Sequence, residues 1–147
     1  MTASSRRSRP RAGQGLLARR LALLALFEDE FRPGSADAAL DRLCHERGVP
    51  SDARQHAAAI VHGVTEHRSE LDARIAFEAP LIPVAELGRV ERTILRSALY
   101  EVLYSAATPS GETMRDAVSL ARIYAGDAAR RLVNGVLGSV SRSGGGA

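Results

Sequence analysis

Histidine and cysteine are the residues of this sequence that could bind a metal or activate a nucleophile. His56, His62 and His67 stand six and five residues apart, whereas two zinc ligands on one helix face stand four apart. Cys44 and His45 are adjacent, so their side chains diverge by about 100° on a helix. The sequence contains no phosphate-binding glycine loop and no local Ser-His-acid arrangement. Catalysis is therefore the weaker class, and we predict no metal site, no cofactor and no enzymatic activity.

Arginine carries the other chemistry of the chain, because all 20 basic residues are arginine. Residues 1–27 hold six arginines and no acidic residue, which gives this segment a charge of +6. Residues 28–111 carry −5 and residues 112–147 carry +2. A basic arm before an acidic middle segment indicates two different partners, one of them a polyanion. The alternative is a solvated tail that binds nothing.

Helices are the elements that must position these groups. Alanine and leucine recur at helical spacing, and no segment alternates in the way of a strand. We expect a flexible arm over 1–15, a flexible tail over 143–147, and helices at about 15–31, 36–47, 51–78, 89–105, 112–125 and from 127 onward. Ser35 is the candidate N-cap of the second helix. Amphipathic helices joined by short loops bury their stripes as a compact all-α bundle, here one domain over 16–142.

The composition excludes several classes of protein. Hydrophobic residues make up 45% of the 147 residues, which is enough for one core and too many for a disordered chain. The sequence has no run of 18 apolar residues, so no helix is predicted to span a membrane. The single cysteine is consistent with a reducing cytoplasm, which is the expected location.

Two helix surfaces carry residues suited to binding. Glu91 lies on the apolar stripe of the helix over 89–105. It either contacts a partner there or interacts favourably with the helix dipole, because it lies in the first turn. One face of the last helix carries two arginines and two glycines, which permit a close approach of a ligand: Arg131, Gly135, Gly138 and Arg142. Tyr124 is a candidate for stacking on a base. The alternatives are helix–helix contact at the glycines, solvated arginines and a core tyrosine.

Four stretches of the sequence occur in the order and spacing of one known family. They are ARRLALLALF at 18–27, GV at 63–64 with ELDARI at 70–75, VERTILRSALYE at 90–101, and AVSLARIY at 117–124 leading to VNGVL at 133–137. Together they cover about residues 16–142 and resemble the NusB family of bacterial transcription antitermination factors.

The resemblance implies about seven helices in two packed subdomains, no enzymatic activity and two direct partners. These partners are boxA-type RNA and NusE, a ribosomal protein of the small subunit, with other Nus factors and RNA polymerase contacted indirectly. Phe27 and Glu91 match positions on the family's binding surfaces and are the protein-contact candidates. The RNA-contact candidates are Arg6, Arg7, Arg9, Arg11, Arg19, Arg122, Tyr124, Arg130 and Arg131. The chain departs from the family pattern at Arg115, in place of an asparagine, and at Leu132, in place of a phenylalanine.

Two other functions stay open on the sequence. A similar domain forms the front of certain ribosomal RNA cytosine methyltransferases, of which this chain would be a fragment. These 147 residues contain no glycine-rich cofactor domain and no second cysteine, which makes that alternative the weaker one. A helical adaptor that binds only protein is the third hypothesis.

Overall fold

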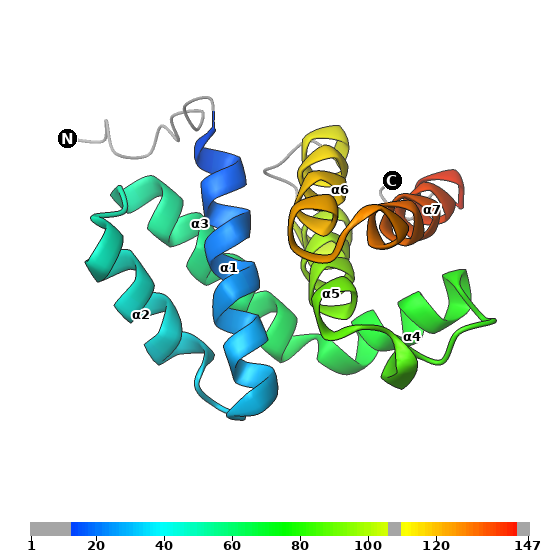
Figure 1. Cartoon of the computed structure of the whole chain (residues 1–147), viewed down its shortest axis with the longest axis horizontal. Helices are drawn as coiled ribbons and strands as arrows, with labels where there is room; N and C mark the ends of the chain where they lie inside the picture. The colour runs from blue at the N-terminus through cyan, green and yellow to red at the C-terminus, as the bar shows by residue number, and fades with distance from the viewer. Residues whose placement is uncertain (1–12, 106–109, 144–147) are drawn as a thin grey trace.

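The computed structural model describes residues 13–105 and 110–143, which form seven α-helices and one short 3₁₀ turn (Figure 1). In chain order these elements are α1 (Gln14–Phe31), α2 (Ala36–Arg47), α3 (Ser51–Glu66), α4 (Arg68–Glu78), η2 (Val84–Glu86), α5 (Arg89–Tyr104), α6 (Ser110–Ala125) and α7 (Asp127–Arg142). No strand occurs in the two described ranges, and the all-α prediction is confirmed. Within the same ranges, none of the helices has the length and apolar character needed to cross a membrane.

Helix α1 lies at the centre of the molecule. It packs on α2 and α3 on one side and on α5 and α6 on the other (Figure 1). Ala18, Ala22 and Ala25 are completely buried, and their small side chains let the neighbouring helices approach closely. The helices therefore form two packed groups, α1–α3 and α4–α7, as the family resemblance implied.

The helix predicted over 51–78 is two helices, so that prediction is wrong in one respect. His67, with φ −107° and ψ 18°, separates α3 from α4. His67 itself keeps both of its backbone hydrogen bonds, because its N–H donates to the Gly63 carbonyl and its carbonyl accepts from Leu71, each at 2.9 Å. The change of direction lets α4 pack along α5, where Asp72 pairs with Arg96. No glycine or proline marks this break.

The turn between α1 and α2 is closed by an aspartate. Asp29 Oδ1 accepts hydrogen bonds from the backbone N–H of Gly34 at 2.8 Å and of Ala36 at 3.2 Å. Ser35 is the N-cap residue of α2, as predicted, but its side chain makes no capping bond, and the Asp29 carboxylate bonds the first backbone N–H of the helix instead. Gly34 adopts φ +90°, which a residue with a side chain rarely does. The carboxylate thus fixes where α1 ends and α2 begins.

Candidate RNA and partner surfaces

Phe27 and Glu91, the two predicted protein-contact residues, lie at the junction of the α1 C-terminus and the α5 N-terminus. The half-buried Phe27 ring packs edge-on against Phe31, with ring centroids 5.2 Å apart. Phe31 is 57% exposed, and the guanidinium carbon of Arg89 lies 4.7 Å from its ring centroid. The Glu91 carboxylate covers Gly88, where a Cβ would stand 2.6 Å from Oε1. We call Phe27, Phe31, Arg89 and Glu91 the aromatic corner.

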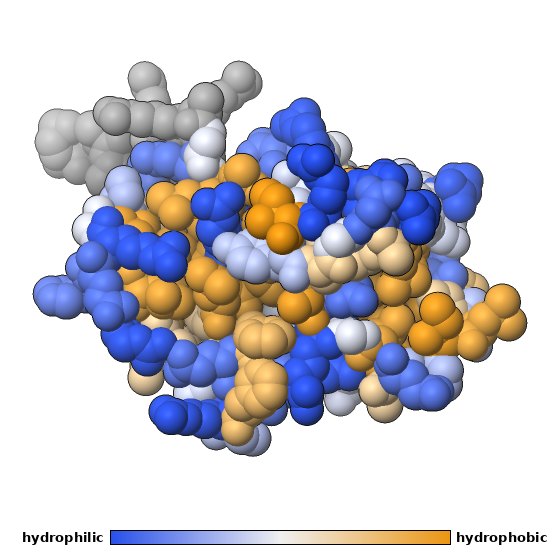
Figure 2. Space-filling view, in the orientation of Figure 1, coloured by the Kyte–Doolittle hydropathy of each residue, from blue (hydrophilic) through white to orange (hydrophobic). Residues whose placement is uncertain are grey.

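The position of Glu91 agrees in part with both of its predicted roles. It is half-buried and lies in the first turn of α5, where the helix dipole favours an anion. It is also accessible to a partner. Figure 2 shows that hydrophobic and hydrophilic residues are interspersed over one face of the molecule.

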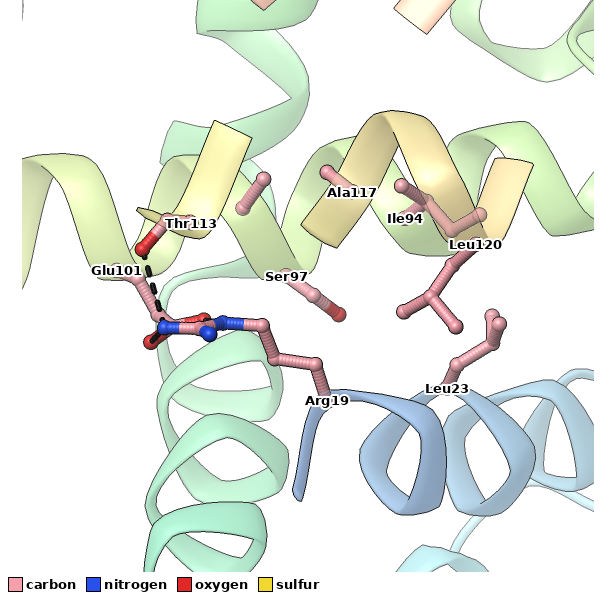
Figure 3. Close-up of a pocket in the computed structure, with 9 residues that line it drawn as sticks. Arg19, Leu23, Ile94, Ser97, Glu101, Thr113, Ala117 and Leu120 are labelled. Carbon is pink, nitrogen blue, oxygen red and sulfur yellow. Dashed lines mark hydrogen bonds and ion pairs between the residues drawn. The ribbon is translucent and has the colours of Figure 1, made fainter. Parts of the chain in front are cut away.

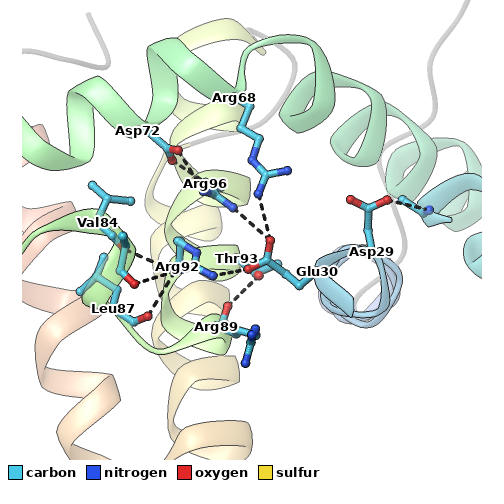
Figure 4. Close-up of polar contacts among 12 residues, drawn as sticks. Asp29, Glu30, Arg68, Asp72, Val84, Leu87, Arg89, Arg92, Thr93 and Arg96 are labelled. Carbon is cyan, nitrogen blue, oxygen red and sulfur yellow. Dashed lines mark hydrogen bonds and ion pairs between the residues drawn. The ribbon is translucent and has the colours of Figure 1, made fainter. Parts of the chain in front are cut away.

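A cluster of ion pairs holds the aromatic corner in place (Figure 4). The buried Glu30 carboxylate at the end of α1 receives Arg92 from α5, Arg68 from α4 at 3.0 Å, and Arg96 from α5 at 3.6 Å. Arg96 also binds both carboxylate oxygens of Asp72, at 2.7 and 2.9 Å. Burial alone would raise the pKa of Glu30, but the hydrogen bond from Arg92 and the nearby arginine charges lower it below its ordinary value. The end of α1 is therefore bound to α4 and α5 by charged groups.

Arg19 is buried, which contradicts the prediction that it contacts RNA. Its side chain is 5% exposed and lies between α1, α5 and α6 (Figure 3). Nε and Nη2 donate to the two carboxylate oxygens of Glu101 at 2.8 and 3.1 Å, and Nη1 donates to Asp116 at 2.6 Å. With its donors bound to carboxylates inside the fold, Arg19 is a structural residue.

A small cleft lies beside this ion pair, between α1, α5 and α6. Leu23, Ile94 and Leu120 form much of its wall, and Arg19 and Glu101 form its polar end (Figure 3). Because both charged groups already bind each other, the cleft offers a ligand mainly apolar contacts.

The turn between α6 and α7 carries the second set of predicted RNA contacts. Arg122 and Tyr124 are exposed, Tyr124 by 40%, so the alternative of a core tyrosine is wrong. Arg130 and Arg131 donate to the two carboxylate oxygens of Asp127 at 2.9 and 2.7 Å. The hydrogen bond from Arg130 and the charges of both arginines lower the pKa of Asp127. One carboxylate thus offsets part of the positive charge at this turn.

The glycine face of α7 is open. A Cβ built on Gly135 would meet no atom within 4 Å among the described residues, so helix–helix contact does not explain this glycine. A Cβ on Gly138 would stand 3.2 Å from Nη1 of Arg142, which is the end of a flexible side chain. Leu132 is partly buried against the core and Arg115 is exposed, so only the second departure from the family pattern faces solvent.

The predicted RNA contacts of the arm, Arg6, Arg7, Arg9 and Arg11, lie outside the described residues. Their point of attachment is known, because α1 begins at Gln14 and Gly15 lies against Glu112 in the first turn of α6. Tyr124 is 12 residues further along α6, about 18 Å away at 1.5 Å per residue. The start of α1 and the α6–α7 turn are therefore at opposite ends of α6.

The histidines make separate contacts. His56 binds Glu101 at 2.9 Å, His62 binds Asp37 at 3.1 Å and His67 binds Glu70 at 3.2 Å. Among residues 13–105 and 110–143, no three His, Cys, Asp or Glu side chains are placed to hold a metal ion.

Phe31 and Arg89 were missed by the sequence reasoning. The four-residue spacing from Phe27 places Phe31 on the same face of α1 and could have identified it. Arg89 has no comparable local signal, because its partner ring is 58 residues away in the chain.

Comparison with known proteins places the chain in a family. The model of the NusB family matches residues 16–142. A transcription antitermination protein NusB from Roseiflexus sp. strain RS-1 is 38% identical over 124 residues, 83% of this chain and 87% of that protein. The same-named protein of Dehalococcoides mccartyi strain CBDB1 is 31% identical over 126 residues, 86% of this chain and 88% of that protein. These names describe an antitermination factor, which confirms the prediction of a non-enzymatic protein.

Solved structures agree with this assignment. A structure of T. maritima NusB has a TM-score of 0.81 at 26% identity and covers 92% of this chain and 93% of its own. A crystal structure of the antitermination factors NusB and NusE in complex with dsRNA has a TM-score of 0.79 at 27% identity and covers 88% of this chain and 96% of its own. Sequence and fold thus agree over nearly the whole described chain, and the protein belongs to the NusB family.

Proposed function

We propose that this protein is a transcription antitermination factor that pairs with NusE and binds boxA-type RNA during ribosomal RNA transcription. The observation that carries the proposal is the match, over 88% of this chain, to a NusB that was solved together with NusE and dsRNA. Contacts with other Nus factors and RNA polymerase are then indirect, through this complex. The relatives are covered over most of their own length and are named as antitermination proteins, which leaves the methyltransferase alternative without support.

The aromatic corner is the proposed NusE surface. It combines a half-buried ring at Phe27, an exposed ring at Phe31 and charges of both signs at Arg89 and Glu91. Aromatic residues and arginine are enriched in the parts of interfaces that contribute most to affinity. The ion pairs around Glu30 fix this surface before a partner arrives, which reduces the entropy lost on binding.

The arginine arm is the proposed RNA surface, together with Arg122 and Tyr124 at the α6–α7 turn. Arginine pairs with phosphates and also stacks on bases, and an exposed tyrosine offers a second stacking face. About four phosphate contacts to single-stranded RNA give a slope of log K against log salt of roughly −3.

One titration tests both halves of the proposal. Binding of boxA-like and scrambled RNA is measured by fluorescence anisotropy, with and without NusE, for the full chain, for a chain lacking residues 1–12, and for Glu91→Lys. We expect the deletion to weaken RNA binding and to flatten its salt dependence, and Glu91→Lys to weaken NusE binding with its helical signal intact. Glu46→Lys, at an exposed position on α2, is the matched control.

The outcomes separate the hypotheses. Equal affinity for boxA-like and scrambled RNA, with NusE binding intact, would favour the protein-only adaptor. RNA affinity unchanged by the deletion would contradict the role of the arm. Loss of folding in Glu91→Lys would mean that Glu91 serves the helix and not the partner.

A further inference from the structure

Arg89 differs from the three arginines that gather at Glu30 near the end of α1. Arg68, Arg92 and Arg96 all bind the Glu30 carboxylate, and Arg96 also binds Asp72, so each of the three has a carboxylate partner within the fold. Arg89 pairs with no carboxylate in the described part of the chain, and its guanidinium lies over the Phe31 ring instead. In Figure 4 its side chain points away from the carboxylate on which the three other arginines converge. A cation–π contact holds a guanidinium in place without neutralising it.

We propose that Arg89, positioned by Phe31, is a specificity-determining residue of the partner surface and binds a carboxylate of the partner protein. This inference rests on the proposed function, in which the aromatic corner binds NusE. It adds the chemistry that the partner must present, which is an acidic side chain beside an apolar one. The acidic side chain pairs with Arg89, and the apolar one packs on the exposed part of the Phe31 ring.

The charges around Arg89 favour a protein carboxylate over an RNA phosphate. Glu86 precedes Arg89 by three residues on the exposed η2 turn, and Glu91 follows by two in the first turn of α5. Carboxylates on both sides of Arg89 in the chain oppose a polyanion, because phosphates beside the one that pairs with Arg89 would approach Glu86 or Glu91. A protein with charges of both signs fits this pattern, with an acid opposite Arg89 and a base opposite Glu91.

The geometry makes the contact selective. Arg89 is the first residue of α5, and the ion pair between Arg92 and Glu30 holds the start of that helix against α1. The Phe31 ring restricts the Arg89 side chain before binding, so less rotamer freedom is lost when a partner carboxylate arrives. Like charges brought together across an interface weaken association, so a partner with a basic residue at this point would be excluded.

The test is a calorimetric titration of NusE into the full-length chain and its variants. Arg89→Gln removes the charge, Arg89→Glu reverses it, and Phe31→Leu keeps an apolar side chain but removes the ring. We expect Arg89→Gln to weaken NusE binding about tenfold, Arg89→Glu to weaken it more, and Phe31→Leu to have an intermediate effect. Arg89→Gln should also flatten the salt dependence of NusE binding, which a purely structural role of Arg89 would leave unchanged. Arg47→Gln is the control, because Arg47 is exposed on α2 and pairs with no carboxylate in residues 13–105 or 110–143.

The outcomes show whether the inference alone is wrong or the proposed function is wrong as well. If the unaltered chain binds NusE and Arg89→Gln binds it equally well, the inference is wrong and the proposed function stands. The inference is also wrong if Arg89→Gln lowers RNA affinity but not NusE affinity, because the ligand of Arg89 would then be a phosphate. If the unaltered chain does not bind NusE, the proposed function fails and the inference fails with it. Thermal unfolding of each variant within about 3 °C of the unaltered chain excludes a loss of folding as the cause, since an exposed substitution changes the melting temperature only slightly.

Discussion

Replacing Arg19 with methionine tests whether a buried ion pair holds α1 on α5. Methionine keeps the length and apolar stem of the side chain and removes its charge. Glu101, which is 2% exposed, would then retain only the contact with His56 at 2.9 Å. Removing one partner of a buried ion pair costs about 3–5 kcal/mol, because the remaining charge is desolvated and unpaired. The bond from His56 places the expected loss near the lower end, at about 3 kcal/mol.

The loss is measured as the free energy of unfolding, by denaturant titration followed by circular dichroism. A domain of this size is typically stable by about 5–15 kcal/mol, so the expected loss is a large fraction of the total. The melting temperature should fall by roughly 10–15 °C. Arg54→Met is the control, because the pair of Arg54 with Asp41 is 3.4 Å long and both side chains are at least 51% exposed. That substitution should cost less than about 1 kcal/mol.

A loss in Arg19→Met no larger than in Arg54→Met would refute the structural role of the buried pair. A folded Arg19→Met variant with unchanged stability and weaker RNA binding would go further. It would restore the role in RNA contact that the sequence predicted for Arg19 and that its burial contradicts.

Two further predictions concern stability. Gly63→Ala should destabilise the protein by about 1–3 kcal/mol, because the new Cβ would stand 2.0 Å from the Tyr100 ring. Gly135→Ala should instead stabilise α7 by up to about 1 kcal/mol, because its Cβ would meet no atom within 4 Å among the described residues. A chemical unfolding experiment in which both variants change the free energy of unfolding in the same direction would contradict this. Burial alone would raise the pKa of Glu101 and of Glu30, but hydrogen bonds from His56 and Arg19 at Glu101, and from Arg92 at Glu30, lower both below the ordinary value of 4.5. A carboxyl group whose pKa is lowered by folding stabilises the folded state at a pH above its pKa in the unfolded chain. The contribution of Glu101 and Glu30 to the free energy of unfolding should therefore be complete above about pH 4.5 and decrease as the pH falls below it. An increase in the free energy of unfolding on acidification would contradict the ion pairs of these two carboxylates.

Most of the fold could be predicted because helical periodicity is a local property. The apolar stripes of α5 and α7 repeat at three and four residues and end at breakers that the sequence displays. The break at His67 could not be predicted, because no glycine or proline marks it and the apolar spacing continues from α3 into α4, which packs on α5. Asp29 as the cap of α2 was missed for a similar reason, since it acts across seven residues from the preceding helix.

The burial of Arg19 could be predicted from the sequence only in part. It stands four residues before Leu23 and seven before Leu26, which places it on the buried face of α1 and could have identified it as a structural residue. Its place in a run of arginines pointed to RNA instead. The carboxylate that makes its burial possible is 82 residues away at Glu101, and no local pattern links the two.

In the aromatic corner, too, some residues could be predicted from the sequence and others could not. Phe27 came from the family resemblance and Glu91 from both its place on an apolar stripe and the resemblance, while their position at one junction depends on how α1 meets α5. Arg89 became a candidate only when the structure placed its guanidinium over the Phe31 ring. Residues that act through a contact between distant segments are therefore the part of the site that sequence reasoning misses.

Helix α1 connects the two proposed binding surfaces. The arm precedes the first residue of α1 in the chain, and the aromatic corner lies where α1 ends, 18 residues or about 27 Å further on. Buried charges bind both ends of α1 to α5, through Arg19 and Glu101 at one end and through Glu30 and Arg92 at the other. We therefore expect that RNA bound to the arm leaves the aromatic corner free for a protein. If that protein also contacts the RNA, each bound ligand raises the effective concentration of the other, and the pair binds RNA more tightly than either protein alone.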